Sequence, residues 1–133
     1  MMDFLHETFK GQDVEYYSLQ KGDGEEEASK CSELINVADQ INSFDDTLAL
    51  IENLDIVIST CTSVVHLAGA VGTKTVVFVP IAAYFTYLTK PKNRPEHTSL
   101  WYGDNFRFFR QTKPKVWDEP MLEAKEFIRN EFL

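Results

Sequence analysis

Hydroxyl side chains gather in the short stretch 60–65, between two apolar runs of different spacing. The run before it, residues 54–59, is apolar and β-branched, which is typical of a strand covered on both faces. The residues after it carry apolar side chains at helical spacing, and Ser and Thr are favoured at the start of a helix. A strand that turns directly into a helix exposes backbone N–H groups, and the helix dipole favours an anion there. We therefore predict a phosphate-binding turn at residues 60–65.

A second turn with phosphate-binding features lies at residues 21–24, where Lys21 precedes two glycines. Three glutamates, residues 25–27, follow it in the first turn of the predicted helix. They favour the helix dipole but would repel a bound anion, so an ordinary capped surface turn is the competing interpretation. Lys21 itself lies before the helix and could reach a phosphate held elsewhere. Neither turn matches G-x-G-x-x-G or the Walker pattern, so the usual dinucleotide and NTPase readings lack support.

Two further residues near the first turn, His66 and Cys61, have side chains that could take part in binding or catalysis. His66 lies one helical turn from any phosphate bound there and could donate a hydrogen bond to it, although a partly buried structural histidine is the alternative. Cys61 could have a pKa lowered by the helix dipole, or it could be a small buried thiol. A thiol nucleophile with His66 as its base is poorly supported, because residues five apart on a strand-to-helix turn are not well placed to pair.

Aromatic and basic residues between positions 84 and 102 could line a pocket for a sugar or a base, and the alternative is core and solvated loop. They are Tyr84, Tyr87, Lys90, Lys92, Arg94, Trp101 and Tyr102.

Composition narrows the class of protein. The 133 residues are enough for one domain with its own core, and 44% hydrophobic and 13% aromatic content argues against global disorder. A formal net charge of -8 argues against a nucleic-acid partner. No apolar run approaches the length of a membrane span and no signal peptide is evident, so the cytoplasm is the expected compartment. Two cysteines, Cys31 and Cys61, are too few for a disulfide framework or a zinc site, and neither a metal nor a cofactor is expected.

Predicted strands and helices alternate along the chain, which indicates an α/β fold of three layers, with a mainly parallel sheet and helices on both faces. The terminal helix should begin with Asp118 as its cap and direct Leu122, Phe127 or Ile128, and Phe132 inward. The expected strands are residues 14–19, 34–37, 54–59, 75–79 and 106–110, and the expected helices are residues 2–10, 25–34, 45–54, 62–71 and 118–132. No internal repeat or linker divides residues 1–133, which we expect to form a single domain.

The chain resembles a known family over residues 14–111. The segments that carry the resemblance are SLQKGDGEEE, FDDTLALIENLDIVISTCTSVVHLAGAVGTKTVVFVP and SLWYGDNFRFFRQ, and the most specific pattern is D-T-x-x-L-I-x-x-L-D-x-V-I-S-x-x-T-x-x-x-H-L-A-G-A. They resemble the C-terminal half of GT-B glycosyltransferases related to the heptosyltransferases of glycosyltransferase family 9, especially the branch fused to tetratricopeptide repeats.

The resemblance implies a Rossmann-like half-domain that binds a nucleotide-sugar donor. It implies that Thr62, Ser63 and Val64 present amides and hydroxyls to the donor diphosphate and that His66 assists them. Lys21 with Gln20 would approach from the first βα turn. Residues 84–102, with Tyr84, Trp101 and Tyr102, would lie over the nucleotide or sugar, and Cys61 would lie close to the sugar.

Two departures from the family pattern limit the expected activity. Cys61 replaces an aspartate that is usual in the family just before the helix. The acceptor-binding half, which in this family supplies the general base, has no counterpart in the chain, and an inverting transfer needs such a base. We therefore name no catalytic residue and expect no transfer by the chain alone, which would be a fragment of a longer chain or would act with a separate N-terminal half. The alternative is a free-standing, non-catalytic module for nucleotide binding or protein interaction, in which a homo-oligomer would cover the face of the missing half.

Overall fold

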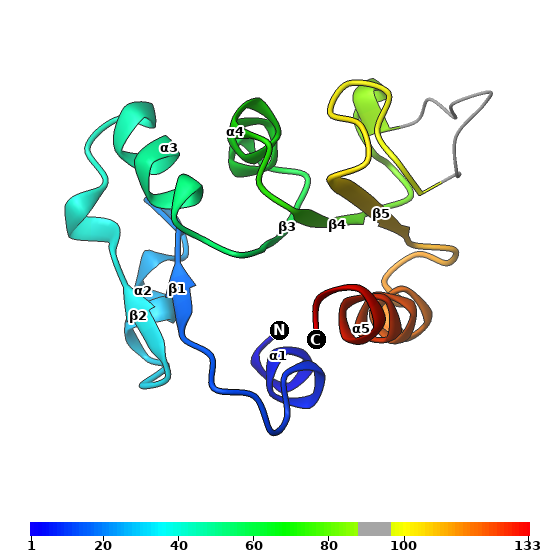
Figure 1. Cartoon of the computed structure of the whole chain (residues 1–133), viewed down its shortest axis with the longest axis horizontal. Coiled ribbons are helices and arrows are strands. Elements are labelled where there is room, and N and C mark those ends of the chain that lie inside the picture. Colours follow the sequence, from blue (N-terminus) through cyan, green and yellow to red (C-terminus); the bar gives the residue numbers. More distant parts are fainter. Residues whose placement is uncertain (88–96) are drawn as a thin grey trace.

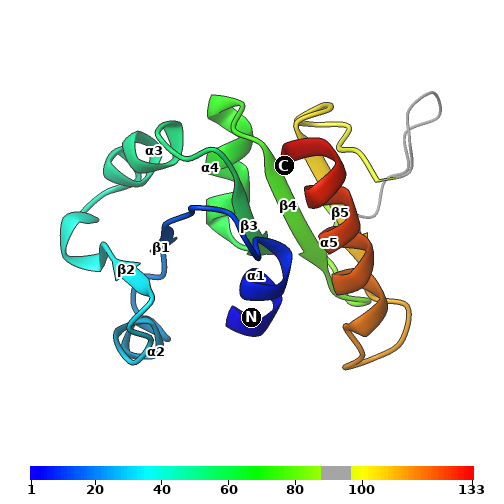
Figure 2. The same ribbon diagram turned by 60° about the horizontal axis from the view of Figure 1, so that its bottom comes forward.

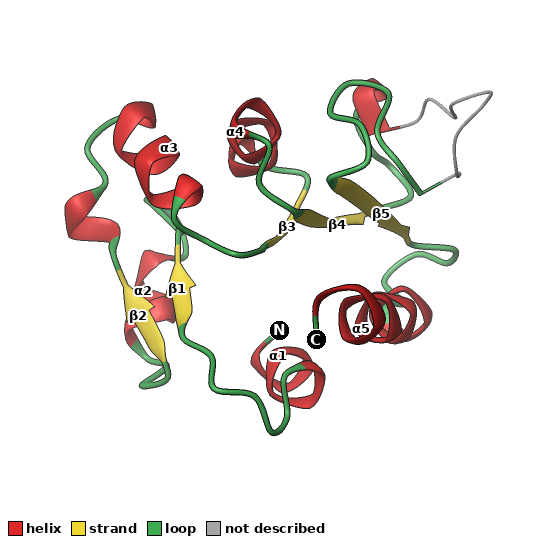
Figure 3. Cartoon of the chain, viewed as in Figure 1, coloured by secondary structure: helices red, strands yellow, loops and turns green. Residues whose placement is uncertain are grey.

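The computed structural model describes residues 1–87 and 97–133 of the chain. Helices and strands alternate along most of it (Figure 3). The strands are β1 (Tyr16–Ser18), β2 (Leu34–Asn36), β3 (Val57–Thr60), β4 (Thr75–Val79) and β5 (Phe106–Arg110). The helices are α1 (Met2–Thr8), α2 (Glu25–Ser29), α3 (Phe44–Glu52), α4 (Ser63–Val71) and α5 (Asp118–Phe132), with the 3₁₀ turns η1 (Ala38–Gln40) and η2 (Phe85–Tyr87).

The strands form two parallel sheets, so the prediction of a parallel α/β fold is confirmed, with one difference. β3, β4 and β5 lie side by side in that order, with Val57 opposite Thr75 and Thr75 opposite Phe106. β1 and β2 form a separate parallel pair, with Tyr16 opposite Leu34. Figure 1 shows this pair standing apart from the larger sheet. The architecture is compatible with a Rossmann-like sandwich whose sheet is divided between β1 and β3.

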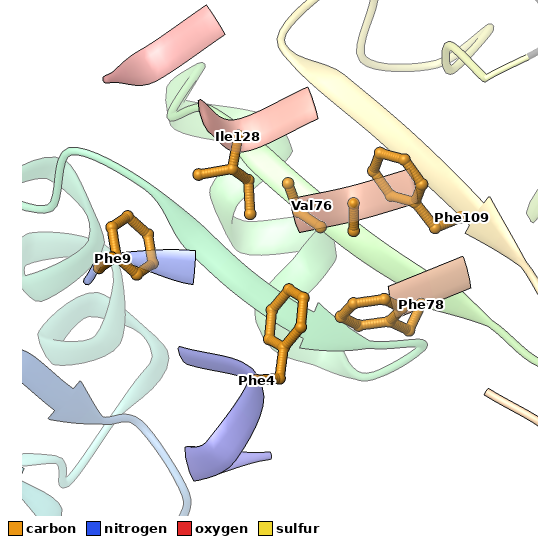
Figure 4. Packing of buried hydrophobic residues seen from close by; sticks show 7 residues of the cluster. Phe4, Phe9, Val76, Phe78, Phe109 and Ile128 are labelled. Carbon is orange, nitrogen blue, oxygen red and sulfur yellow. The ribbon is translucent and has the colours of Figure 1, made fainter. Parts of the chain in front are cut away.

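Helices cover both faces of the larger sheet. Figure 1 shows α4 on one face and α1 with α5 on the other, and α3 packs beside α4. On the α1 and α5 face, buried Phe4 and Phe9 of the N-terminal segment meet Phe78 of β4 and Ile128 of α5 (Figure 4). The ring of Phe4 lies edge-on to that of Phe78, with 5.5 Å between the ring centroids. The two ends of the chain therefore build one core.

Residues that favour helix ends set the start of α3 and the end of α4, the two helices that form one layer. Ser43 caps α3, because its side chain accepts a hydrogen bond from the Asp46 N–H at 3.2 Å. α4 ends at Gly72, which adopts a left-handed conformation with φ of 78°, a conformation that glycine adopts without strain. Val65 and Ala68 of α4 are buried against the sheet and α3. The start of α4 is thereby held above the end of β3.

Three predictions about the helices are wrong in detail. Trp117, not Asp118, is the N-cap residue of α5, although Asp118 still lies in the first turn. Leu122 is 57% exposed, because the buried face of α5 runs through Pro120, Ala124 and Ile128 at intervals of four residues. The helix expected over residues 25–34 ends at Ser29.

Candidate functional site

A cavity of about 1150 Å³ lies between the two sheets. One wall is formed by β1 and the turn after it, and the opposite wall by β3 and the start of α4. Among the predicted site residues, those that line it are Gln20, Lys21, Thr62, Ser63 and Val64. Parallel strands end at the same edge of a sheet, and ligands of open α/β sheets bind outside that edge where the strand order reverses. The structure brings residues of both predicted turns to one cavity, after the ends of β1 and β3, although these strands belong to separate sheets.

The wall at α4 offers backbone donors. Thr62 is the N-cap residue of α4, and within the described residues no side chain caps this end of the helix. The Thr62 hydroxyl instead lies 3.2 Å from that of Ser59, and the Thr62 N–H donates to the Thr60 carbonyl at 2.8 Å. The first turn of α4 contains no acidic residue. An anion at this end would meet amides, hydroxyls and the positive end of the helix dipole.

The opposite wall supplies a positive charge. Lys21 is the one basic side chain among the described residues that line the cavity, and Asp23 is the one acidic side chain. The Lys21 ammonium donates to the Ala38 carbonyl at 2.7 Å, which fixes it beside the cavity and leaves two of its three donors for other partners. The Gln20 amide donates to the Asp23 carbonyl at 2.5 Å.

In the turn at residues 21–24, a donor that could bind an anion is already bound by a carboxylate of α2. The Gly22 N–H donates to the Glu25 carboxylate at 3.2 Å, and the Glu25 N–H donates to the Gly22 carbonyl at 3.0 Å. A carboxylate therefore occupies the place that an anion would take at this helix start. The arrangement favours the interpretation of a capped surface turn, beside which Lys21 and Gln20 supply the hydrogen-bond donors that line the cavity.

The start of α3 adds lining residues that the sequence reasoning missed. Asn42, Ser43 and Phe44 line the same cavity, and the Phe44 side chain is 67% exposed. Ser43 is also the N-cap residue of α3. The signal that could have revealed this part of the site is a large aromatic residue placed directly after the cap, where a helix presents its first turn to solvent.

His66 lies on another side of α4. Its Nδ1 lies 2.7 Å from the Tyr102 hydroxyl, and its Nε2 lies 3.2 Å from the Tyr87 hydroxyl. His66 is not among the described residues that line the cavity. Since both ring nitrogens are engaged, this position does not support a direct contact with a diphosphate, and the structural role considered from the sequence is the one that the contacts favour.

Tyr102 also touches the helix itself. Its ring lies against Gly69, where a Cβ atom would come within 2.5 Å of the Tyr102 Cγ. Glycine at this position therefore permits the close approach of the ring, one turn beyond His66. Tyr102 is thus a packing partner of α4 rather than a lining residue of the cavity.

Cys61 does not have the low pKa that the helix dipole could give. Burial raises the pKa of the Cys61 thiol, and the nearby charge of Arg110 offsets this only in part. The thiol lies 3.8 Å from the Phe78 carbonyl and packs with the core around Tyr87 and Phe108. A partly buried, packed thiol is the interpretation that these contacts favour, and His66 faces two tyrosines instead of Cys61.

The remaining aromatic candidates lie away from the cavity. Tyr84 is 65% exposed and Trp101 is 62% exposed, and neither lines the cavity. Tyr84 contacts Phe85, with 4.5 Å between the ring centroids. Lys90, Lys92 and Arg94 lie outside the described residues.

Two other features, a metal site and a membrane span, are not found in residues 1–87 and 97–133. There, no three His, Cys, Asp or Glu side chains are grouped so as to hold a metal ion. None of the helices in the same part of the chain has the length and apolar character to cross a bilayer. Comparison with protein-family models, with curated proteins and with solved structures finds no match to this chain. The resemblance to glycosyltransferases therefore stays a prediction.

Proposed function

We propose that the chain binds the diphosphate of a nucleotide, as the donor half of a nucleotide-sugar glycosyltransferase. The observation that supports this most is the shared cavity. Gln20 and Lys21, which follow β1, line it together with Thr62, Ser63 and Val64, which follow β3. The lysine supplies a positive charge and the start of α4 supplies amides and hydroxyls, so a diphosphate would have donors on both sides.

The lining of the cavity also favours a nucleotide. Its walls combine the polar turns with apolar side chains of the helices, such as Phe44 of α3 and Leu67 of α4. A nucleoside diphosphate presents a charged group at one end and a flat, less polar group at the other. The two kinds of wall fit these two ends.

Calorimetric titration tests the proposal. We would titrate the purified chain with UDP, GDP, ADP, their sugar conjugates and inorganic pyrophosphate. Saturable binding of one of these, weakened about tenfold or more by Lys21→Met and by Thr62→Val, is expected, because each change removes a hydrogen bond to a charged group worth about 1.5 to 3 kcal/mol. Lys10→Met is the matched control, since Lys10 is exposed and does not line the cavity.

Two results would contradict the proposal. One is the absence of binding by all of these probes at millimolar concentration. The other is binding that the Lys21 and Thr62 variants leave unchanged, which would place the diphosphate elsewhere.

We infer no catalysis by the chain alone, because the family that it resembles takes its acceptor-activating base from the acceptor-binding half. A partner that contributes an acceptor-binding half is part of the proposal, and turnover of a nucleotide sugar by the purified chain would refute this part. The cytoplasmic location stays a prediction from the sequence.

The exposed aromatic side chains support the alternative, a non-catalytic interaction module. Tyr84 and Trp101 are each more than 60% exposed, and exposed aromatic side chains are enriched at protein interfaces. Light scattering coupled to gel filtration would separate the two proposals. A homodimer that Trp101→Ala converts to a monomer, in a chain that binds none of the nucleotides, would favour the module.

A further inference from the structure

The cavity runs along the backbone edge of β3. Its lining includes the consecutive residues 56–60, and successive side chains of a strand point to opposite faces, so only a cavity beside the strand edge can touch all of them. Within the described part of the chain, β3 pairs with β4 alone. The Val57 N–H donates toward β4, to the Lys74 carbonyl at 2.9 Å. By alternation, the N–H groups of Ile58 and Thr60 point toward the cavity.

The side chains of the β1 segment already occupy both helical layers beside β3. Tyr16 packs with the α1 and α5 core that also contains Ile58, and its hydroxyl lies 3.5 Å from the Leu5 carbonyl. Leu19, three residues later, packs with the opposite core, which contains Val57 and Ile51. β1 therefore has the side-chain environment of the strand next to β3, although it is not paired with β3. Figure 2 shows the two strands apart.

We propose that a bound diphosphate draws β1 against β3 and completes one five-stranded parallel sheet in the order β2-β1-β3-β4-β5. This inference rests on the proposed function, because the ligand is the group that both walls would hold. Lys21 and Gln20 follow β1, whereas Thr62 and Ser63 follow β3, so one diphosphate that contacts both turns shortens the distance between the two strands.

The faces of the strands determine the register. Tyr16 and Ile58 pack into the same core, so they must lie on the same face of the completed sheet. Gln20 and Thr62 should reach the same ligand, which places them at the same level along the strands. Both conditions are met when Tyr16 lies opposite Ile58 and Ser18 lies opposite Thr60, because a shift by one residue would turn every side chain to the wrong face.

Amide hydrogen exchange measured by NMR tests the closure, with UDP, GDP, ADP and inorganic pyrophosphate as probes. In the free chain the amides of Ile58 and Thr60 should exchange at least tenfold faster than those of Val57 and Ser59, which face β4. Addition of a probe that binds should slow hydrogen exchange of the Ile58 and Thr60 amides at least tenfold, because these N–H groups would then donate hydrogen bonds to β1.

The same spectra separate failure of the inference from failure of the proposed function. Shifts of the Ser63 and Val64 amides without added protection of Ile58 and Thr60 would show binding without closure and would overturn this inference alone. No spectral change with any probe would overturn both. Protection of Ile58 and Thr60 already present in the free chain would show a sheet closed without ligand and would also overturn the inference.

A disulfide lock gives a second measurement. Ser18→Cys and Thr60→Cys, in a chain with Cys31→Ser and Cys61→Ser, would be joined in the predicted register, because neighbouring parallel strands lie within the Cα separation that a disulfide spans. We expect the oxidised form to bind the probe at least tenfold more tightly than the reduced form of the same sample. Failure of the bridge to form, or weaker binding when it has formed, would count against closure.

Discussion

The hydroxyl of Tyr102 lies 2.7 Å from Nδ1 of His66, 36 residues earlier in the chain. The hydroxyl of Tyr87 approaches the other ring nitrogen at 3.2 Å. A neutral imidazole has one donor and one acceptor nitrogen, so both positions can be satisfied at once. His66 therefore joins η2 and the segment before β5 to helix α4.

Removal of the Tyr102 hydroxyl should destabilise the chain. Tyr102→Phe keeps the ring against Gly69 but leaves a half-buried ring nitrogen of His66 without this partner, at a cost of about 1 to 2 kcal/mol in the free energy of unfolding. Urea denaturation would measure it. The added change His66→Leu should make the Tyr102 substitution nearly neutral, and equal costs in both backgrounds would show that the hydrogen bond contributes nothing.

Gly69→Ala should destabilise, contrary to the usual gain of replacing glycine in a helix. The new methyl group would meet the Tyr102 ring at less than van der Waals distance, and overpacking of this kind costs about 1 to 3 kcal/mol. In a Tyr102→Ala background the same change should stabilise by up to about 1 kcal/mol, which is the helix preference for alanine over glycine. Thermal unfolding of the four proteins checks the change of sign.

Alkaline pH should weaken the fold through Tyr87. Burial, followed by the nearby Cys61 and Tyr102, raises the pKa of Tyr87 from 10.0 to about 12. The folded state therefore keeps this proton when the unfolded state loses it. Its stabilising contribution is complete below pH 10 and is lost as the pH rises through about 12.

The difference in free energy of unfolding between the parent and Tyr87→Phe should therefore decrease as the pH rises from 10.0 to about 12. Ultraviolet absorbance of tyrosinate would locate the titration of Tyr87 by difference between the two proteins. A midpoint for Tyr87 near 10 would contradict this prediction.

Alkylation should show that the Cys61 thiol ionises at a higher pH than an ordinary cysteine thiol. Burial raises the pKa of Cys61 above its usual 9.0, so less thiolate is present at any pH below that value. In a Cys31→Ser chain, the rate of reaction with iodoacetamide should have a pH midpoint above 9.0. The midpoint, unlike the rate itself, does not depend on access of the reagent. A midpoint below 8 would restore the possibility of an activated thiol.

Arg129 should contribute more to stability than its exposed position implies. Its guanidinium donates to the Thr8 carbonyl at 3.0 Å and to the Glu7 carbonyl at 2.7 Å, and so satisfies the last carbonyls of α1. Arg129→Gln should reduce the free energy of unfolding by about 1 kcal/mol. Lys125→Gln, which removes only an ion pair with exposed Glu7, is the control and should have a smaller effect.

The sequence predicts most of the strands and helices because their signals are local. The apolar run of β4, the glycine that ends α4 and the serine that caps α3 each act over a few residues, and the structure confirms the strand and the two helices predicted there. The predicted phosphate turn of α4 is local in the same sense, because it needs only a strand, hydroxyl residues and a helix in succession.

Local sequence signals do not report contacts between distant residues. The separation of β1 from β3 depends on backbone pairing, which side-chain patterns do not report. Tyr87 and Tyr102, which bond to His66, follow it in the chain by 21 and 36 positions. The sequence around His66 therefore does not show that its ring nitrogens are already engaged. Cys61 was open to two interpretations because its burial comes from Tyr87 and Phe108, which lie on other elements.

The core shared by α1 and α5 has a consequence for synthesis of the chain on the ribosome. Phe4 and Phe9 are made well before their partner Ile128 and before Arg129, which satisfies the end of α1. The α1 segment therefore keeps two phenylalanine side chains uncovered until α5 has also been made. During that interval these side chains are the natural target for chaperones that bind nascent apolar segments, and docking of α5 is the step that ends it.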